Sequence, residues 1–398
     1  MRIGITSSGP LQGRRVAVTG LGALTCVGVG VEALWEAIQS PEAPTSKRLG
    51  EFDASHIGGP KELRRLDPFT LYGLVAADEA WRDSGLTSPI VDGGSIVTTG
   101  IGGLQTVLEQ VNTLNTKGPA RVSPFMVPMM MPNAATAAVS MRFGLGGPAE
   151  TVTTACAAGT HAIGNAARLV ASGRCSVALA GGAEAVMVEI AESGFRNMTA
   201  LSNTDLSRPF DVDRDGFVMG EGAGVMVLED WDHAVARGAT IYAELIGAAS
   251  TADAHHITAP DPEGNGAIRC MELALADADI SAGEVSHINA HGTSTPLNDL
   301  AESVAMRHVF ANKVPPVTSV KGHLGHSLSA AGALEGVVSV LTLRHQMIPP
   351  TAGTVNVDPA IGLDVVTKSP RPGSYDVVLS NSFGFGGHNG SVIFRRVH

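Results

Sequence analysis

Short runs of β-branched and aliphatic residues, most of them ending at glycine, recur along this 398-residue chain and constrain its fold more than any other feature. Segments with helical periodicity lie between these runs, and glycines close two of them, at Gly85 and Gly173. Uninterrupted apolar strands that alternate with helices are typical of sheets covered on both faces. The sequence therefore predicts an α/β protein.

The expected elements can be assigned to residue ranges. Strands are expected at residues 14–22, 95–103, 149–159, 176–184, 224–230, 242–250, 287–293, 315–323 and 376–387. Helices are expected at residues 32–39, 70–85, 161–173, 266–278 and 330–346.

One pattern occurs faintly twice: a strand, a polar junction, a helix of small residues, and then a strand with a glycine turn. It spans residues 152–184 and again residues 317–387, which places Cys156 and His326 at equivalent junctions that would face one another. A boundary is expected near residue 235, giving an N-terminal half of residues 1–235 and a C-terminal half of residues 236–398. Since no low-complexity linker separates the halves, we expect one continuous core.

The overall charge and the cysteine content exclude several classes of protein. A net charge of −11 gives no general attraction to nucleic acid or to anionic membranes. Four scattered cysteines form neither a disulfide framework nor a Cys-x-x-Cys zinc site, which fits a reducing compartment. Residues 16–31 are too short an uncharged stretch for a membrane span, and residues 1–15 have no apolar segment typical of a secretion signal. We expect a cytoplasmic protein.

Cys156 allows two interpretations. At the start of an expected helix, the partial positive charge and free N–H groups would lower the pKa of its thiol, and the small neighbours Ala155, Ala157 and Gly159 would leave room for a substrate. Alternatively, it is a small buried residue that fills space, which is the commoner role of a lone cysteine in an alanine-rich helix. The second interpretation also applies to the other cysteines, Cys26, Cys175 and Cys270.

Histidines mark two further segments. His291 follows an expected strand and begins a Gly-Thr-Ser-Thr-Pro stretch, which predicts a turn and not a helix. Lys321, His323 and His326 lie together in a glycine-broken segment without acidic or cysteine ligands, so no metal site is expected. Instead, a lysine beside histidines disfavours the imidazolium form and keeps the rings neutral.

Residues 381–390 form a glycine-rich segment after the last expected strand. They do not match the dinucleotide fingerprint, and the sequence contains neither a Walker A motif nor H-E-x-x-H. Phenylalanines that alternate with glycines indicate a mobile loop whose backbone approaches a ligand and whose rings gate a pocket.

Five segments together closely resemble the β-ketoacyl-acyl-carrier-protein synthases of the KAS I/II type, in the same order from about Arg15 to the C-terminus. They are "TACAAG", "RPFDVDRDGFVMGEGAG", "NAHGTSTPLND", "VKGHLGHSLSAAGALE" and "NSFGFGGHNG". The resemblance implies a thiolase-like, five-layered α-β-α-β-α sandwich made of two duplicated halves. It also implies a homodimer, or a heterodimer with a related subunit. Substrates would arrive on the phosphopantetheine of an acyl carrier protein, without a metal or other cofactor.

The resemblance assigns roles residue by residue. Cys156 would be the acyl-accepting nucleophile, His291 and His326 would serve decarboxylation and condensation, and Lys321 would orient and tune them. The backbone N–H groups of Cys156 and Phe385 would form an oxyanion hole.

Other matched positions concern substrate and carrier. The substrate-binding residues implied are Thr293, Thr295, Phe383, Met126 and Met130, although the methionines could equally be ordinary core filling. The carrier-docking residues implied are Lys61, Arg64 and Arg65, for which a solvated helix face is the alternative. Glu302 and Glu335 would order neighbouring groups and not transfer protons.

The expected activity is a decarboxylative Claisen condensation of an acyl-enzyme thioester with malonyl-acyl-carrier-protein, in fatty acid or polyketide chain elongation. The alternative is a catalytically silent partner of the chain-length-factor type in a heterodimer, but such subunits typically lose the cysteine that is present here as Cys156. A non-decarboxylating thiolase would need a second cysteine after Cys270, and KAS III-type enzymes use Cys-His-Asn in place of a second histidine.

Overall fold

The computed structural model describes residues 11, 13–311 and 313–398. The sequence predicts no secretion signal in residues 1–15. Residues 1–10 of this segment lie outside the described residues. The strands are β1 (Val16–Thr25), β2 (Gly28–Val29), β3 (Gly94–Thr98), β4 (Val177–Glu184), β5 (Gly222–Asp230), β6 (Ala243–Ala252), β7 (His287–Asn289), β8 (Val317–Thr318), β9 (Met347–Ile348), β10 (Arg371–Pro372), β11 (Val377–Gly384) and β12 (His388–Arg396). The helices are α1 (Val31–Ile38), α2 (Pro60–Leu63), α3 (Pro68–Ser84), α4 (Leu104–Lys117), α5 (Met126–Met130), α6 (Ala134–Phe143), α7 (Ala158–Ala171), α8 (Glu189–Asn197), α9 (Trp231–Ala236), α10 (Asn265–Asp277), α11 (Pro296–Val309), α12 (Lys321–Leu324) and α13 (Ser329–His345), with 3-10 turns η1 (Pro119–Arg121), η2 (Ala155–Ala157) and η3 (Ala282–Glu284).

A mixed ten-stranded sheet runs through the molecule in the order β3-β4-β5-β1-β6-β12-β11-β7-β8, with β2 paired to β1. β1 pairs with β5 along its whole length but with β6 only through Val16, Ala17 and Val18. The parallel pairs β3–β4, β11–β7 and β7–β8 lie toward the two ends of this order. β1 and β6 therefore join two sheet halves, one before and one after residue 235.

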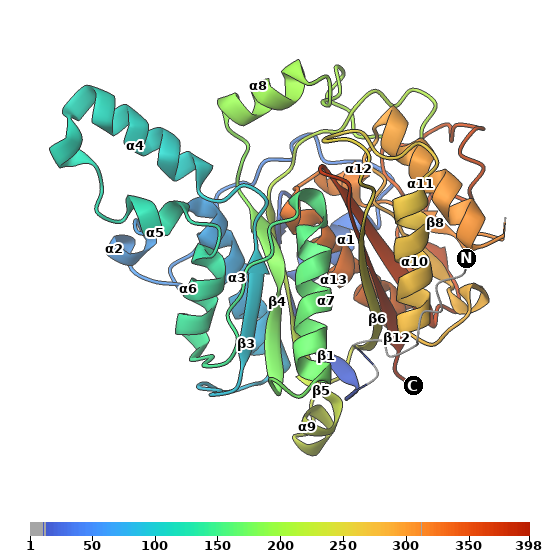
Figure 1. Cartoon of the computed structure of the whole chain (residues 1–398), viewed down its shortest axis with the longest axis horizontal. Helices are drawn as coiled ribbons and strands as arrows, with labels where there is room; N and C mark the ends of the chain where they lie inside the picture. Colours follow the sequence, from blue (N-terminus) through green and yellow to red (C-terminus); the bar gives the residue numbers. More distant parts are fainter. Residues whose placement is uncertain (1–10, 12, 312) are drawn as a thin grey trace.

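Helices cover both faces of each sheet half. α3 and α6 pack on the outer side of the first half, α7 and α13 lie between the halves, and α10 packs on the outer side of the second half with α11 against it (Figure 1). The predicted five-layered α-β-α-β-α sandwich is confirmed. The division at residue 235 stays a prediction, because one sheet and one core cross it.

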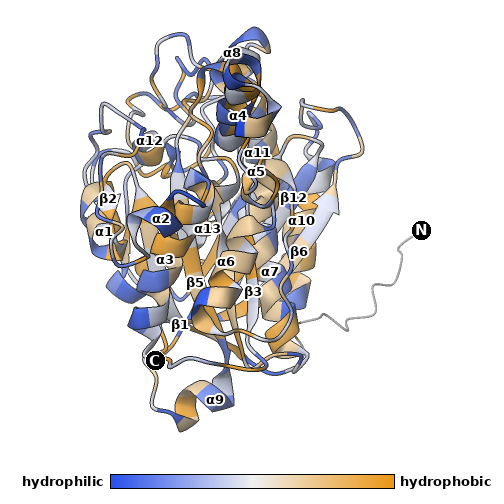
Figure 2. Cartoon of the chain, turned by 90° about the vertical axis from the view of Figure 1, so that its left-hand side faces the viewer, coloured by the Kyte–Doolittle hydropathy of each residue, from blue (hydrophilic) through white to orange (hydrophobic). Residues whose placement is uncertain are grey.

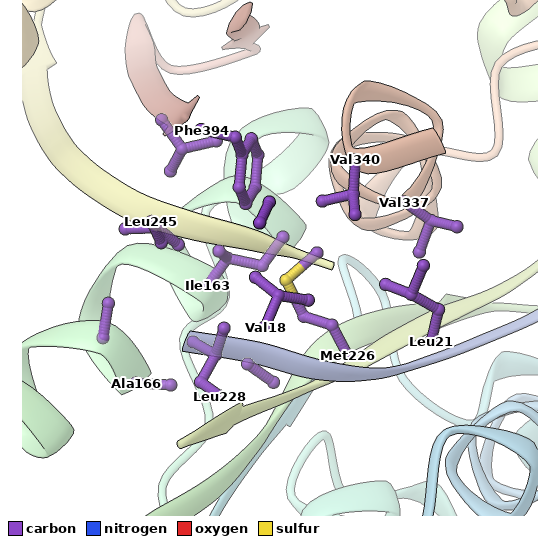
Figure 3. Packing of buried hydrophobic residues seen from close by; sticks show 14 of the residues in the cluster. Val18, Leu21, Ile163, Ala166, Met226, Leu228, Leu245, Val337, Val340 and Phe394 are labelled. Atoms are coloured by element: carbon purple, nitrogen blue, oxygen red, sulfur yellow. The ribbon is translucent and has the colours of Figure 1, made fainter. Parts of the chain in front are cut away.

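The largest cluster of buried apolar side chains lies where these layers meet. Val18 and Met226 come from the first sheet half, Ile163 and Val337 from the two central helices, and Phe394 from the second sheet half (Figure 3). In Figure 2 the strands at the centre are mainly orange, whereas α2 on the outside is blue. The expected continuous core is therefore present.

Several local expectations differ from the structure. The strand expected at residues 315–323 is reduced to Val317–Thr318, because α12 begins at Lys321. The strand expected at residues 149–159 does not form: only Ala149 bridges to Ser95 of the edge strand β3, and residues 155–159 belong to η2 and the start of α7. The predicted turn after His291 ends at Thr295, because Pro296 has the fixed φ and missing N–H that suit the first position of a helix and begins α11. The segment 381–390 is mostly strand: β11 continues to Gly384 and β12 starts at His388.

Among the described residues, no helix combines the length and the apolar character needed to cross a membrane.

The two central helices approach one another backbone to backbone. A Cβ atom added at Gly159 in α7 would lie 2.4 Å from the carbonyl oxygen of Ser329 in α13, and one added at Gly332 in α13 would lie 2.3 Å from Thr160 Oγ1. A Cβ atom added at Gly182 in β4 would likewise lie 2.6 Å from the carbonyl oxygen of Ser329. The glycines thus set the separation of the layers.

We predict that Gly159→Ala destabilises the protein by about 1–3 kcal/mol, because the added methyl group must push α13 away from α7. The free energy of unfolding in urea measures this. Gly194→Ala in α8 is the matched control: an added Cβ there meets no described heavy atom within 4 Å, so its stability should be unchanged or higher by up to about 1 kcal/mol. Equal stability of the two variants would contradict the packing argument.

Candidate active site

Cys156 occupies the 3-10 turn η2, immediately before α7. The preceding residue, Ala155, has a left-handed backbone with φ of 48°, a conformation that costs free energy and recurs at functional sites. Gly384 of β11 passes so close that a Cβ there would lie 3.1 Å from the backbone nitrogen of Cys156. The hairpin after β11 is therefore held directly against the cysteine.

Burial raises the pKa of the Cys156 thiol to about 11, although the charge of Lys321 and the backbone N–H of Phe385 act in the opposite direction. The expectation of a lowered thiol pKa is wrong for the net shift, because the loss of solvent outweighs the helix start. The thiol therefore holds its proton at neutral pH, and a base must accept that proton when the sulfur reacts.

His291 is buried at the end of β7, where a carboxylate from α11 fixes its backbone. Glu302 accepts hydrogen bonds from the backbone N–H groups of His291 and Gly292, each at 2.8 Å. Burial raises the pKa of Glu302 to about 7, which these two N–H groups oppose. The predicted ordering role of Glu302 thus has a geometric basis, since both of its oxygens bind the loop.

His326 lies opposite His291, between α12 and α13. Its backbone N–H donates to Val218 O at 2.7 Å, and its carbonyl oxygen accepts from Gly220 N at 3.0 Å. The rings of His291 and His326 meet edge to face, with centroids 5.3 Å apart, and Phe217 packs against His326 at the same separation. The second histidine is thus held on both sides.

Lys321 is the buried cation behind the two histidines, with 1% of its surface exposed. Its Nζ donates to the carbonyl oxygen of His291 at 2.6 Å, lies 3.3 Å from Nδ1 of the same residue, and forms an ion pair with Glu335. Because the ammonium group can only donate, Nδ1 of His291 accepts and its proton sits on Nε2.

The same environment determines the charges of the site. Burial and the charge of Lys321 hold the pKa values of His291 and His326 well below their ordinary value, so both imidazoles are neutral at pH 7. Burial raises the pKa of Glu335 to about 7, while its ion pair with Lys321 opposes that rise. The expected tuning of the histidines by Lys321 is consistent with these shifts.

A cavity of about 360 Å³ opens in front of these groups. Thr293 and Thr295, whose hydroxyls are 2.9 Å apart, line it, as do residues 258–260 and the exposed Leu297. The predicted site residues that line this cavity are Cys156, His291, His326, Thr293, Thr295, Phe383 and Phe385.

Two aromatic wall residues were not among the predicted site residues: Phe217, which lies in one of the segments that carry the resemblance, and Phe195, for which the sequence gave no signal. Phe195 of α8 lies 6.4 Å from Phe385 and 5.4 Å from Phe217, measured between ring centroids. All three rings line the cavity. One wall of the cavity is therefore apolar and comes from three separate segments.

Other predicted residues lie elsewhere. Met126 and Met130 are on α5, outside the lining of this cavity, and Met130 O accepts a hydrogen bond from Gly103 N. Lys61, Arg64 and Arg65 are exposed on and just after α2.

A further basic residue accompanies the α2 group. The guanidinium of Arg65 lies 4.3 Å from the ring centroid of Phe125, just before α5, and Arg121 of η1 is exposed a few residues earlier. The sequence interpretation missed Arg121, for which the segment "GPARVSPF" gave no separate signal.

The paired histidines of the α12 segment do not share a ligand. His323 Nε2 lies 2.6 Å from Ser40 O, so its ring faces away from the cavity that His326 lines. Within the ranges that the structure describes, no three His, Cys, Asp or Glu side chains are grouped as metal ligands would be.

Comparison with known proteins gives consistent matches along the chain. The beta-ketoacyl synthase N-terminal domain model matches residues 39–234, and the corresponding C-terminal domain model matches residues 242–355. The 3-oxoacyl-[acyl-carrier-protein] synthase 2 of Synechocystis sp. is 42% identical and covers 97% of this chain and 99% of its own length. The protein of the same name from Rhizobium meliloti is 41% identical, over 96% of this chain and 99% of its own.

Solved structures agree in fold. The ishigamide ketosynthase/chain length factor has a TM-score of 0.91 at 32% identity, covering 97% of this chain and 100% of its own. The AntDE:AntF complex, a type II PKS acyl-carrier protein with its ketosynthase bound to the hexaketide, has a TM-score of 0.89 at the same identity and coverage. With a cysteine and two neutral histidines around one cavity, and with relatives over nearly its whole length, the chain belongs to the β-ketoacyl synthase family.

Proposed function

We propose that the protein catalyses a decarboxylative Claisen condensation between an acyl group on Cys156 and a malonyl group on an acyl carrier protein, in fatty acid or polyketide chain elongation. One observation carries this proposal: Cys156, His291 and His326 line a single cavity, and the buried Lys321 contacts one of the histidines from behind. The names of the bacterial relatives support the same reaction.

The first half-reaction is acyl transfer. The sulfur of Cys156 attacks the carbonyl carbon of the incoming thioester, its proton passes to a neutral imidazole in the cavity, and the pantetheine thiolate leaves and takes up a proton. The backbone N–H of Phe385, which already faces the Cys156 sulfur, and the N–H of Cys156 itself stabilise the tetrahedral oxyanion. The close approach of Gly384 to Cys156 supports this pairing of donors.

The second half-reaction breaks and forms a carbon–carbon bond. Carbon dioxide leaves the malonyl thioester, and the electron pair of the broken bond forms an enolate. Neutral N–H donors from His291 and His326 stabilise the enolate oxygen, where charge develops only in the transition state. The enolate carbon then attacks the acyl carbonyl on Cys156, and the cysteine thiolate departs and is protonated.

The hydroxyls of Thr293 and Thr295 fit the polar arm of phosphopantetheine, because this hydroxyl pair lines the same cavity as His291. Phe385 and Phe383 would separate this arm from the acyl group, while Met126 and Met130 remain predicted contacts of a longer acyl chain. We propose that the reaction needs no cofactor other than the phosphopantetheine of the carrier protein.

A carrier protein of acidic surface is the partner that fits the exposed basic group on α2. Lys61, Arg64 and Arg65 supply the positive charge, and the exposed Arg121 extends it. Complementary charges would steer the carrier toward this face.

A second subunit fits the exposed apolar residues of the α4–α5 region. Val111, Leu114, Phe125, Val127 and Met131 are between 39% and 58% exposed in the single chain. We propose a dimer through this region, either of two copies or with a related subunit. The silent chain-length-factor alternative is disfavoured because Cys156 and both histidines are present.

We predict that Cys156→Ala abolishes acylation. After incubation with an acyl-carrier thioester, the parent should gain the mass of one acyl group in intact-protein mass spectrometry and the variant none. Cys270→Ala, which removes a cysteine that is equally buried but outside the cavity, should be acylated like the parent. Acylation of Cys156→Ala at the parental level would refute the proposed nucleophile.

Lys321→Met should move the acid limb of malonyl-carrier decarboxylation to higher pH. An imidazolium would stabilise the malonyl carboxylate in the ground state, whereas a neutral imidazole does not, so the rate of carbon dioxide loss falls as pH drops through the pKa values of the histidines. The charge of Lys321 adds to burial in lowering these pKa values, so its removal should raise them. Carbon dioxide release across a pH series measures the limb.

The effect of Lys321 is measured against a reference variant that lacks the charge of Glu335. Removal of Lys321 alone leaves the buried carboxylate of Glu335 unpaired, so Glu335→Gln serves as the reference and the double variant as the test. If the acid limb of the double variant coincides with that of Glu335→Gln, Lys321 does not tune the histidines.

A further inference from the structure

Lys47 is a second buried lysine near the active site. It lies in the segment between α1 and α2, and only 7% of its surface is exposed. It is not among the residues that line the substrate cavity. Lysine is rarely buried to this extent without a partner, so its contacts require an explanation.

Its ammonium group binds the backbone of α12, the short helix that begins at Lys321. Lys47 Nζ donates hydrogen bonds to the carbonyl oxygens of Gly322 at 2.9 Å and His323 at 2.6 Å. These carbonyls belong to the last residues of a helix, where oxygens lack helical partners and cations are favourable. Lys47 thus acts as a side-chain cap on the helix that carries the catalytic ammonium group.

The charge of Lys47 is available for these bonds. Burial lowers its pKa to about 8, so the ammonium form still predominates at neutral pH. In the part of the chain that the structure describes, Lys47 forms no ion pair with a carboxylate, and the two carbonyls are its hydrogen-bond acceptors. Hydrogen bonds from a charged donor are about twice as strong as neutral ones.

The same segment holds α12 at two more points. Ser40 O lies 2.6 Å from Nε2 of His323, and a Cβ added at Gly325 would lie 3.1 Å from Cβ of Lys47. Gly325 directly precedes His326. The stem of Lys47 therefore packs against the turn between Lys321 and His326, while its head group binds the helix before that turn.

A third contact reaches the other side of His326. Leu49 N donates to Glu221 Oε1 at 2.9 Å, and the neighbouring Gly220 N donates to His326 O. Residues 40–49 therefore contact the segment before His326 directly, and they also hold Glu221, the neighbour of the residue that binds the carbonyl oxygen of His326.

We propose that Lys47 is a positioning residue for the decarboxylation step, which it serves by fixing the backbone that carries Lys321 and His326. This inference rests on the proposed function. Cys156 lies in η2, before α7, and neither hydrogen bond of Lys47 reaches these two elements. Decarboxylation needs N–H donors from both His291 and His326, whereas acyl transfer needs only one imidazole as the base, which His291, held by Glu302, still supplies. Loss of Lys47 should therefore slow decarboxylation more than acyl transfer to Cys156.

The test compares the two half-reactions in Lys47→Met. Acyl loading of Cys156 is followed by time-resolved mass spectrometry, and decarboxylation by carbon dioxide release from malonyl-carrier protein, per acylable Cys156. Because a displacement of about 1 Å in a catalytic group can cost about 100-fold in rate, decarboxylation should fall about 10- to 100-fold. Loading should stay within about threefold of the parent.

Two variants separate positioning from general damage. Lys47→Arg keeps the charge and can donate to both carbonyls, so it should restore much of the decarboxylation rate. Lys368→Met makes the same change at an exposed lysine and should behave as the parent. If Lys47→Met does not fold, Lys47→Arg is compared with Lys47→Gln, which keeps a donor but not the charge, and the arginine variant should decarboxylate faster.

The outcomes are distinct. Parental decarboxylation in Lys47→Met, or a parallel fall of both half-reactions that arginine does not reverse, overturns the positioning role. Equal decarboxylation in the arginine and glutamine variants does the same. If the parent itself neither loads Cys156 nor releases carbon dioxide, the proposed function fails instead, and the inference about Lys47 falls with it.

Discussion

The buried ammonium group of Lys321 is the interaction on which the rest of the site depends. It joins the loop after β7, through the carbonyl oxygen and ring of His291, to helix α13, through Glu335. A buried cation without such partners would be too costly to keep, so the two segments must meet for the fold to be stable. The same charge, together with burial, keeps both histidines neutral. The contacts that Lys321 needs in order to be buried thus also determine the protonation states of the histidines in the cavity.

The central helix pair brings the cysteine to this cation. α7 begins just after Cys156 and α13 carries Glu335, and glycines such as Gly159 and Gly332 let the two backbones approach closely. Larger side chains at these positions would separate the layers, and with them the nucleophile and the histidines. The abundance of glycine and the scarcity of aromatic residues in the chain follow from this layer of tightly packed helices.

Much of this arrangement could be predicted from the sequence, because regular periodicity reports burial directly. Most expected strands and all five expected helices formed, and the faint repeat placed Cys156 and His326 opposite one another. Strand β12 was missed since its residues follow a glycine-rich turn that suggested only a loop. The sign of the thiol pKa shift was also wrong, because burial of Cys156 depends on how β11 and α13 cover it. Lys47 and the residues that it contacts are about 275 positions apart in the sequence, and no local sequence pattern predicts these contacts.

Burial is the largest cause both of the raised pKa of the thiol and of the lowered pKa values of the imidazoles, and together these shifts favour condensation over side reactions. A proton moves unfavourably from Cys156 to either histidine in the free site, so the thiolate forms only as a thioester is attacked. After decarboxylation, the same neutral imidazoles are weak acids. They can donate hydrogen bonds to the enolate oxygen, but they protonate the enolate carbon poorly. The carbanion therefore survives long enough to meet the acyl carbonyl on Cys156, which is the electrophile placed nearest to it.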